Sequence, residues 1–356
     1  MNIFFFFLLT NHRPGVILHY NDRMICFILS VYPERTAKRR VNVMEKKKVF
    51  IDGKAGTTGI SIYGRLQSRD DIELIVLPEE ERKSDEARKK AINSCDVAIL
   101  CLPDDAARQA VSFCENEDVV ILDASTAHRT DDSWVYGMPE YSSAQKEKIA
   151  GAKRIAIPGC HASGFIALVA PLVRAGLLRK TEPLVCHSLT GYSGGGKKMI
   201  ADYSAPDLPE KLKAPRIYAL SQQHKHLPEM TKVTGLVTEP IFLPVVSDFY
   251  SGMLVTVPLF SSQIAPPFNK DCISRIYSET YDGKSNIYYC PDMEEDGFLD
   301  SNALSGNDKM QLGVFGNDER IILAARYDNL GKGAAGAAEQ CLEIVLKRMK
   351  EKDATQ

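Results

Sequence analysis

A run of glycines after a short apolar strand constrains this chain more than any other feature. Val49–Ile51 is β-branched and aromatic, and the next eight residues carry glycine at positions 53, 56 and 59. Ile60, Tyr63 and Leu66 then recur at helical spacing. A strand, a glycine turn and a helix in this order predict dinucleotide binding, because glycine lets backbone amides approach a pyrophosphate. A tight strand–helix turn without a ligand is the alternative. The candidate cofactor-binding residues here are Gly53, Gly56, Thr57, Thr58 and Gly59.

Strands and helices continue to alternate beyond the glycine turn. Ile72–Leu77, Val97–Leu102 and Val119–Leu122 read as strands, whereas Asp85–Ser94 and Asp104–Glu115 read as helices. Strands separated by helices predict crossover connections and a parallel sheet covered on both faces. The expected fold class is therefore α/β, with a Rossmann-type doubly wound sheet in the first half of the chain.

The segment after the second strand bears on which dinucleotide binds. An acidic residue there would bond the ribose of NAD, whereas a cation would accept the 2′-phosphate of NADP. Pro78–Lys83 carries charges of both signs. We favour NADP through Arg82 or Lys83, and a solvated, charged helix start is the alternative interpretation.

Composition excludes several classes of function. The 356 residues include 44 Lys and Arg against 46 Asp and Glu. Nucleic-acid binding as the main role needs a basic surplus, and a polytopic membrane protein needs apolar spans of about 20 residues. Nine scattered cysteines without a C-x-x-C pair favour a reducing compartment over a disulfide scaffold. The length predicts two domains.

Residues 1–45 differ from the sequence that follows. Phe4–Leu9 is too short to span a bilayer, and no small-residue cleavage site marks a secretory signal. We expect this extension to lie outside the fold and Met44 to be the natural start; a short targeting or membrane-surface segment is the alternative. Without residues 1–43 the chain carries 38 basic and 44 acidic residues, so anionic ligands require a local positive field.

Cys160 is the cysteine with a catalytic setting. Ile155–Ile157 reads as a strand, Pro158–Gly164 as a turn, and Phe165–Leu178 as an apolar helix. A thiol in the turn before a helix lies at the positive helix end, which lowers its pKa and favours the nucleophilic thiolate. Backbone amides of the same turn can stabilise an oxyanion. A small residue packed in a tight turn is the alternative.

A thiol nucleophile needs an acid–base partner, and the pair His224 and His226 offers one. Both lie in the polar stretch Gln222–Glu229. If that stretch is extended, the two rings point to opposite faces, so that one can reach Cys160 while the other orients substrate or faces away. No metal-ligand spacing surrounds them, and we expect no metal.

Eight segments, in order from about Lys46 to the C-terminus, carry a resemblance to a known family. They are Phe50–Gly59, Cys101–Ala107, Asp123–Arg129, Tyr136–Glu140, Pro158–Gly164, Gly191–Lys198, His224–Glu229 and Asp328–Gly336. Together they resemble N-acetyl-gamma-glutamyl-phosphate reductase in its shorter second type, within the semialdehyde dehydrogenase superfamily. One segment alone would be a weak signal, but eight in family order are specific. The extension lies outside the resemblance.

The resemblance implies a fold and a reaction. It implies an NADP-binding Rossmann domain at 46–159, an α+β catalytic and dimerisation domain with a mixed sheet at 160–328, and a C-terminal helix at 329–356 that packs back on the cofactor domain. The implied reaction is NADPH-dependent reduction of N-acetyl-L-glutamyl 5-phosphate to N-acetyl-L-glutamate 5-semialdehyde with phosphate release, in arginine biosynthesis. A cytoplasmic homodimer or homotetramer, with no nucleic-acid or membrane partner, is expected.

The family's nucleophile matches Cys160, and its acid–base histidine falls in the pair, where we favour His226 and keep His224 as the alternative. Residues proposed for the acyl phosphate substrate are Arg129, Ser163, Lys197 and Lys198. Residues proposed for the cofactor are Ser125, Gly164 and Asn329, the last of which matches a family loop near the nicotinamide. Surface cations, capping hydroxyls and a turn-forming asparagine are their respective alternatives.

Two other functions compete with this interpretation. A related aspartate- or aminoadipate-semialdehyde dehydrogenase would differ in a few pocket residues. A cofactor-sensing regulator is disfavoured because a sensor does not need Cys160 together with a histidine pair.

Overall fold

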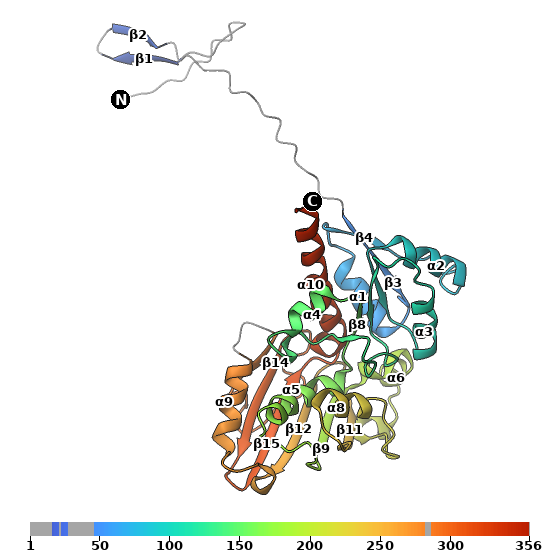
Figure 1. Ribbon diagram of the computed structural model, residues 1–356, viewed down its shortest axis with the longest axis vertical. Coiled ribbons are helices and arrows are strands. Elements are labelled where there is room, and N and C mark those ends of the chain that lie inside the picture. Colours follow the sequence, from blue (N-terminus) through green and yellow to red (C-terminus); the bar gives the residue numbers. More distant parts are fainter. Residues whose placement is uncertain (1–15, 21–22, 28–45, 282–285, 356) are drawn as a thin grey trace. The chain divides into compact units, whose positions relative to one another are not determined.

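The computed structural model describes residues 16–20, 23–27, 46–281 and 286–355 (Figure 1). The chain divides into two units, residues 1–45 and residues 46–356. In the first unit β1 (Val16–Tyr20) pairs with β2 (Arg23–Phe27) as an antiparallel hairpin. The apolar run Phe4–Leu9 and Met44 lie outside the described residues.

The first sheet of the second unit is parallel, with strand order β4-β3-β5-β6-β8-β7. Its strands are β3 (Lys47–Asp52), β4 (Ile72–Ile75), β5 (Val97–Leu100), β6 (Val120–Asp123), β7 (Val135–Tyr136) and β8 (Arg154–Ala156). The helices between them are α1 (Thr57–Leu66), α2 (Asp85–Ser94), α3 (Asp104–Ser112) and α4 (Gln145–Gly151). The predicted Rossmann-type sheet is confirmed.

Strand β3 illustrates why these strands are apolar on both sides. Val49 and Ile51 pack in one cluster with Ile62 of α1, whereas Phe50 packs in another with Ile92 of α2. A strand buried on both faces needs a continuous apolar run rather than an alternating one.

The second sheet is mixed, with strand order β10-β11-β9-β12-β15-β14-β13. Its strands are β9 (Val185–Gly191), β10 (Arg216–Ile217), β11 (Ile241–Ser247), β12 (Met253–Phe260), β13 (Ile287–Tyr289), β14 (Met310–Gly316) and β15 (Arg320–Tyr327). One face carries α5 (Cys160–Arg174), α8 (Leu227–Thr234) and α9 (Lys270–Thr280) (Figure 1). Shorter elements are η1 (Pro139–Tyr141), η2 (Tyr192–Gly195), α6 (Gly196–Tyr203), α7 (Glu210–Lys213) and η3 (Ser261–Gln263).

Helix α5 is buried on every side over residues 161–173 and forms the centre of this second core. Pro171 inside the helix has no N–H to donate to the carbonyl of Ala167. The hydroxyl of Tyr281 donates to that carbonyl instead, at 2.9 Å. The buried backbone group freed by the proline is therefore satisfied from outside the helix.

The last strand returns the chain to the first sheet. After β15 comes one π-helical turn, η4 (Gly331–Ala335), and then α10 (Gly336–Asp353). Apolar side chains of α10, among them Leu342 and Leu346, are buried in the same cluster as Val49 and Ile51. The final helix thus covers part of one face of the first, parallel sheet.

One expectation about local structure needs correction. The helix after the 158–164 segment begins at Cys160 rather than at Phe165, because its buried packing outweighs the turn preference of small residues. Further along the chain, β11 begins at Ile241, directly after Pro240. The segment 281–308 contains β13, a short strand that pairs with β14.

Candidate active site

The glycine turn lies between β3 and α1 and leaves no room for a side chain at Gly53 or at Gly59. Gly53 has φ +86°, and a Cβ there would lie 2.3 Å from the carbonyl oxygen of Cys101. A Cβ on Gly59 would lie 2.3 Å from the carbonyl oxygen of Gly53. The turn therefore holds α1 directly against the end of the sheet, with the helix N-terminus facing outward from the strand ends, as anion binding requires.

The first turn of α1 also fits a phosphate group chemically. It has no acidic residue and no side-chain cap, so the N–H groups of its first turn are not capped by a side chain. The hydroxyl oxygen of Thr57 is buried without a hydrogen-bond partner. A buried hydroxyl without a partner is costly unless a ligand uses it, so these residues fit a dinucleotide pyrophosphate.

The loop after β4 holds Arg82 at the surface, where its guanidinium pairs with Glu79 at 2.6 Å. Helix α2 begins only at Asp85, capped by the hydroxyl of Ser84. Arg82 is available to a ligand if the exposed pair opens, because exposed pairs contribute little. Its binding to a 2′-phosphate stays a prediction.

Cys160 is the first residue of α5, and Gly159 precedes it as the N-cap. Burial raises the pKa of the Cys160 thiol, while Arg129, the backbone N–H of His161 and Lys225 act to lower it. A Cβ on Gly159 would lie 2.4 Å both from Arg129 and from Nε2 of His226. Glycine at position 159 therefore allows the histidine and the arginine to approach the chain immediately before the thiol.

The histidine pair lies in a turn rather than an extended segment, so its rings do not point to opposite faces. The rings of His224 and His226 lie 4.8 Å apart, and Nδ1 of His224 accepts a hydrogen bond from the backbone N–H of His226. Burial lowers the pKa of His226 well below its usual range and that of His224 to about 4. Nδ1 of His226 is buried without a hydrogen-bond partner. Of the two, it is His226 whose Nε2 lies beside Gly159.

His161, to which the sequence analysis assigned no role, joins this cluster. Its Nδ1 lies 2.7 Å from the hydroxyl of Ser188, and its Nε2 lies 2.7 Å from the hydroxyl of Tyr218. The rings of His161 and His226 are 5.6 Å apart. Burial lowers the pKa of His161 to about 3, so this ring is neutral and takes part in a fixed hydrogen-bond chain.

Glu229, which sequence reasoning also missed, binds three groups from separate elements. Its carboxylate accepts hydrogen bonds from Arg129 (3.1 Å), from the hydroxyl of Tyr136 (2.7 Å) and from the backbone N–H of Gly159 (2.8 Å). The residue is 1% exposed. Its place three residues after His226, in a segment that resembles the family, was the signal that could have found it.

The guanidinium of Arg129 is held by the protein itself. Nε donates to the carbonyl of Ile157 and Nη2 to that of Ala124, while Nη1 bonds Glu229. Arg129 thus lies beside Cys160 with each nitrogen already bonded once. A contact with substrate phosphate would use its remaining N–H groups and stays a prediction.

The other predicted residues are engaged in local hydrogen bonds. The hydroxyl of Ser125 donates to Asp123 at 2.7 Å, and that of Ser163 donates to the carbonyl of Gly159 at 3.0 Å. Asn329 is 1% exposed and bonds Ser193 and the backbone N–H of Gly252. These contacts favour a structural contribution, and the ligand contacts stay predictions.

The glycines at 194–196 lie close to the glycine turn between β3 and α1. A Cβ on Gly196 would lie 3.9 Å from the Thr57 hydroxyl, and one on Gly194 would lie 3.4 Å from the amide nitrogen of Asn329. Lys197 and Lys198 follow as exposed residues of α6, and Lys198 pairs with Asp202 at 3.1 Å. The 194–196 segment therefore lies close to both Thr57 and Asn329, and the two lysines that follow it lie at the surface.

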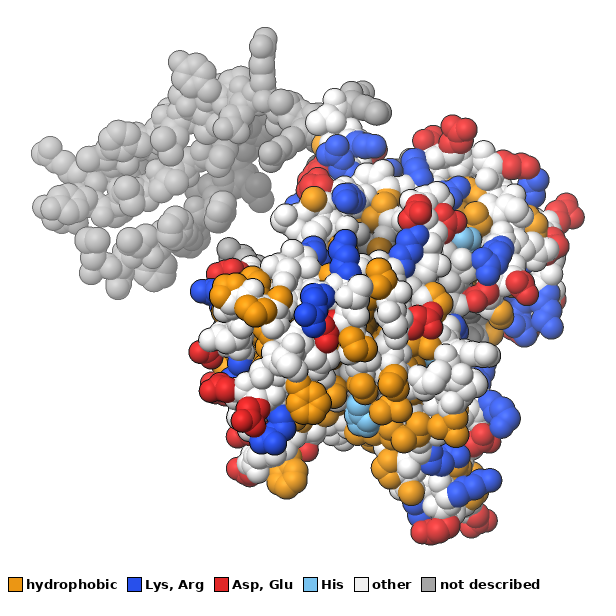
Figure 2. Space-filling view, turned by 60° about the horizontal axis from the view of Figure 1, so that its bottom comes forward, with side chains coloured by type: hydrophobic (Ala, Val, Ile, Leu, Met, Phe, Trp, Pro, Cys, Tyr) orange, Lys and Arg blue, Asp and Glu red, His pale blue; other side chains and the backbone are white. Residues whose placement is uncertain are grey.

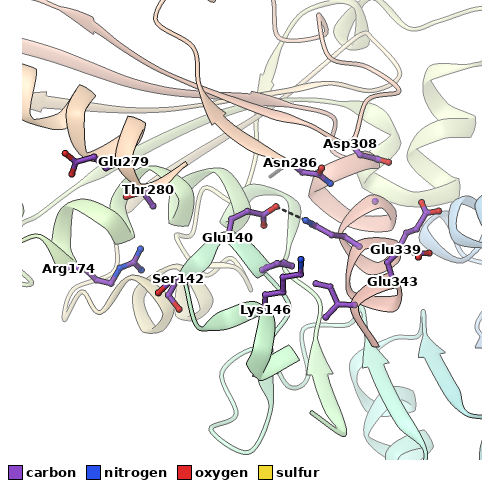
Figure 3. A pocket seen from close by; sticks show the side chains of 15 residues that line it. Glu140, Ser142, Lys146, Arg174, Glu279, Thr280, Asn286, Asp308, Glu339 and Glu343 are labelled. Atoms are coloured by element: carbon purple, nitrogen blue, oxygen red, sulfur yellow. Dashed lines mark hydrogen bonds between the residues drawn. The ribbon is translucent and has the colours of Figure 1, made fainter. Parts of the chain in front are cut away.

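A cleft of about 1040 Å³ lies apart from Cys160 and the glycine turn, and none of the predicted site residues lines it. Figure 3 shows it between α4, α9 and α10, with Arg174 and Glu279 on one side, Lys146 in the middle and Glu339 with Glu343 on the other side. At its floor, Gln340 donates to Glu140, whose carboxylate also binds the buried Lys332 at 2.7 Å. The thiol of Cys160 and the rings of His224 and His226 do not line this cleft.

Across residues 46–281 and 286–355, no helix combines the length and the hydropathy needed to cross a membrane.

Two protein-family models match the second unit. The semialdehyde dehydrogenase NAD binding domain matches residues 48–150, and the semialdehyde dehydrogenase dimerisation domain matches residues 160–329. An N-acetyl-gamma-glutamyl-phosphate reductase 2 of a Nostoc species is 46% identical over 85% of this chain and 98% of its own length. The chain belongs to the N-acetyl-gamma-glutamyl-phosphate reductase family.

The chain is similarly close to further members of the reductase family. The enzymes of Sinorhizobium medicae and Pseudomonas putida are 44% and 42% identical, each over 85% of this chain and nearly all of their own length. Among solved structures, aspartate semialdehyde dehydrogenase II of Vibrio cholerae, complexed with ASA, matches with a TM-score of 0.64 at 16% identity over 85% of this chain and 99% of its own. The aspartate semialdehyde dehydrogenase of Candida albicans, solved with NADP, gives 0.58 at 15% over the same shares. At this identity the likeness shows the shared fold.

The unpartnered hydroxyl of Thr57 gives a prediction for cofactor binding. Thr57→Ala should raise the Kd for NADP about five- to tenfold, because one hydrogen bond to the pyrophosphate is lost. The stability of the ligand-free protein should not fall, since the hydroxyl has no partner there. Fluorescence titration and urea unfolding measure the two effects, with Thr57→Ser as the matched control. An unchanged Kd would contradict this role.

Proposed function

We propose that this chain catalyses the NADPH-dependent reduction of N-acetyl-L-glutamyl 5-phosphate to N-acetyl-L-glutamate 5-semialdehyde, with release of phosphate, in arginine biosynthesis. Its membership of the reductase family supports the substrate. The observation that carries the chemistry is Cys160 at the first residue of α5, with His226 against the preceding glycine. A thiol and a buried imidazole in this relation are suited to acyl transfer.

Acyl transfer begins with removal of the thiol proton. Burial raises the pKa of Cys160 and lowers that of His226, so both groups are neutral near pH 7. His226 then acts as general base when the sulfur attacks the acyl carbonyl. A carbon–sulfur bond forms, the carbon–oxygen bond to phosphate breaks, and phosphate leaves with the electron pair. The product of this step is a thioester on Cys160.

The second step reduces that thioester. The turn Gly53–Gly59 with Thr57 would hold the pyrophosphate of NADPH, which would supply the hydride for the thioester carbonyl. The N–H groups in the first turn of α5 stabilise the oxyanion that forms on the carbonyl oxygen. The carbon–sulfur bond then breaks to give the aldehyde, and Cys160 regains a proton from His226. The protein's residues thus bind, orient and move the proton.

Substrate binding has several candidate residues. Arg129 acts on the thiol of Cys160, and Ser163 bonds the carbonyl of the preceding Gly159. Lys197 and Lys198 could approach the phosphate from α6. Arg216 of β10 is a further candidate, because its Nε is buried without a partner. A guanidinium with a free N–H is suited to a carboxylate, which the proposed substrate carries at its other end.

We further propose that the enzyme is a homodimer or homotetramer and works in the cytoplasm, where its thiol stays reduced. Along β12, Met253, Val255, Val257 and Leu259 are buried, while the alternate residues Pro258 and Phe260 are exposed. Ile322 is exposed on β15, which pairs with β12, and Ile241 is exposed on β11, which β9 separates from β12. Figure 2 shows hydrophobic side chains gathered over this mixed-sheet part of the molecule. Exposed apolar patches of this kind support a subunit interface.

The activity is tested in the oxidative direction, with N-acetylglutamate semialdehyde, NADP and phosphate. Wild-type enzyme should reduce NADP only when phosphate is present, and Cys160→Ser should lower kcat at least about a thousandfold. Cys272→Ser, at a half-buried thiol on α9, is the control and should keep full activity. A turnover of the Cys160 variant equal to that of wild type would overturn the mechanism. A preference of the wild-type enzyme for aspartate semialdehyde would overturn the proposed substrate assignment.

The pH profile of kcat/KM separates the two histidines. In wild type, activity should fall at acid pH as the base becomes protonated, below the usual histidine range because burial lowers its pKa. His226→Asn should lower kcat about a hundredfold or more and flatten this acid limb. His224→Asn should mainly raise KM and leave the acid limb of the pH profile unchanged. The reverse pattern would assign the base to His224.

The interface is tested by a charge on the exposed sheet face. Ile322→Glu should shift the protein to the monomer, because pairing the face would bury the new carboxylate without a partner. Light scattering after size-exclusion chromatography gives the mass. Ile60→Glu, at an equally exposed position on α1, should keep the oligomer. A wild-type monomer, or an Ile322→Glu oligomer, would contradict this assignment.

A further inference from the structure

Tyr327 reaches from the end of β15 to the nucleophile. Its side chain is fully buried, and its hydroxyl donates a hydrogen bond to the carbonyl oxygen of Cys160 at 2.5 Å. The same hydroxyl accepts a hydrogen bond from the backbone N–H of Gly164 at 3.1 Å. These two backbone groups are the pair that faces each other across the first turn of α5. One side-chain oxygen thus fixes the turn that carries the thiol.

The packing around this hydroxyl is close. A Cβ on Gly164 would lie 2.7 Å from the Tyr327 oxygen and 2.8 Å from Val255 of β12. Gly164, which the sequence suggested for cofactor binding, therefore has a local reason to be glycine. Any larger residue there would displace the tyrosine from the carbonyl of Cys160.

The carbonyl that Tyr327 binds belongs to the same planar peptide as the N–H of His161. That N–H acts on the sulfur of Cys160 and lowers the pKa of the thiol. Because the peptide is rigid, fixing its carbonyl also fixes the direction of its N–H. A hydrogen bond accepted by the carbonyl also polarises the peptide and makes the N–H a better donor.

The segment after Tyr327 holds the nucleophile from a second side. A side chain at Gly333 of η4 would crowd the nucleophile, since its Cβ would lie 3.0 Å from Cβ of Cys160. Its N–H donates to the carbonyl of Asp328 at 3.0 Å. The end of β15, the π-helical turn and the first turn of α5 are therefore packed as one unit around Cys160.

We propose that Tyr327 is a positioning residue for the nucleophile, which holds the Cys160–His161 peptide so that its N–H stabilises the thiolate. This inference rests on the proposed function only in taking Cys160 as the nucleophile. Tyr327 itself does not contact the substrate; it acts through the peptide. Its loss should therefore change thiol reactivity rather than substrate affinity.

The same helix offers a matched control. The hydroxyl of Tyr277 is also fully buried and also donates to a carbonyl of α5, that of Leu168, at 2.6 Å. Tyr277→Phe removes one buried hydroxyl from α5 just as Tyr327→Phe does, but two turns away from Cys160. Comparison of the two variants separates an effect on the nucleophile from a loss of helix stability.

The experiment measures how fast iodoacetamide alkylates Cys160 between pH 6 and 10, followed by mass spectrometry of the peptide that contains it. Tyr327→Phe should raise the apparent pKa of the thiol by about half a unit to one unit, which means about three- to tenfold slower alkylation at pH 7.5. The kcat should fall by a similar factor while both KM values stay within about twofold. Tyr277→Phe should leave the alkylation profile unchanged.

Equal alkylation profiles for Tyr327→Phe and wild type would overturn the proposal, as would an equal shift in Tyr277→Phe. Alkylation needs no substrate, so this result is independent of whether the proposed reaction takes place. If Tyr327→Phe does not fold, 3-fluorotyrosine at position 327 keeps the shape and makes the hydroxyl a stronger donor. It should lower the thiol pKa and speed alkylation; an unchanged profile would overturn the proposal.

Discussion

The Glu229 carboxylate joins parts of the chain that are far apart in sequence and must meet for the site to exist. It binds Arg129, which follows β6, Tyr136, which lies in β7 of the first sheet, and the backbone of Gly159, which precedes the helix of the second core. Removing a carboxylate and a guanidinium from water costs several kcal/mol each, and only complete hydrogen bonding recovers it. All three carboxylate contacts and all three guanidinium nitrogens are used here, so the interaction favours one arrangement strongly over its alternatives.

That arrangement sets the electrostatic character of the site. The thiol and three histidines lie in a region where burial disfavours charge on each of them. The Arg129 charge is compensated by Glu229, while the N–H groups at the start of α5 supply partial positive charge without a counterion. Such a site keeps its acid–base groups neutral until substrate arrives, and it stabilises negative charge where a carbonyl oxygen would develop it.

The sequence predicted the features that depend on local patterns. Glycine spacing and continuous apolar runs identified the parallel sheet, and the turn before an apolar run identified Cys160. It did not predict Glu229 or Tyr327, because their importance depends on backbone groups 70 and 167 residues away. Short elements such as β13, three residues long, carry too little pattern to be recognised. The histidine turn was missed since two alternating histidines have the same spacing in a strand and in a turn.

The final helix has a consequence for how the protein is made. One face of the first sheet is covered by side chains of α10, which lie within the last 21 residues of the chain. While the ribosome is still synthesising the second sheet, α10 has not yet been made, so the finished strands of the first sheet leave this apolar face exposed. The nucleotide-binding half therefore cannot mature before the catalytic half, and a prematurely terminated chain would retain neither a complete first core nor a competent cofactor site.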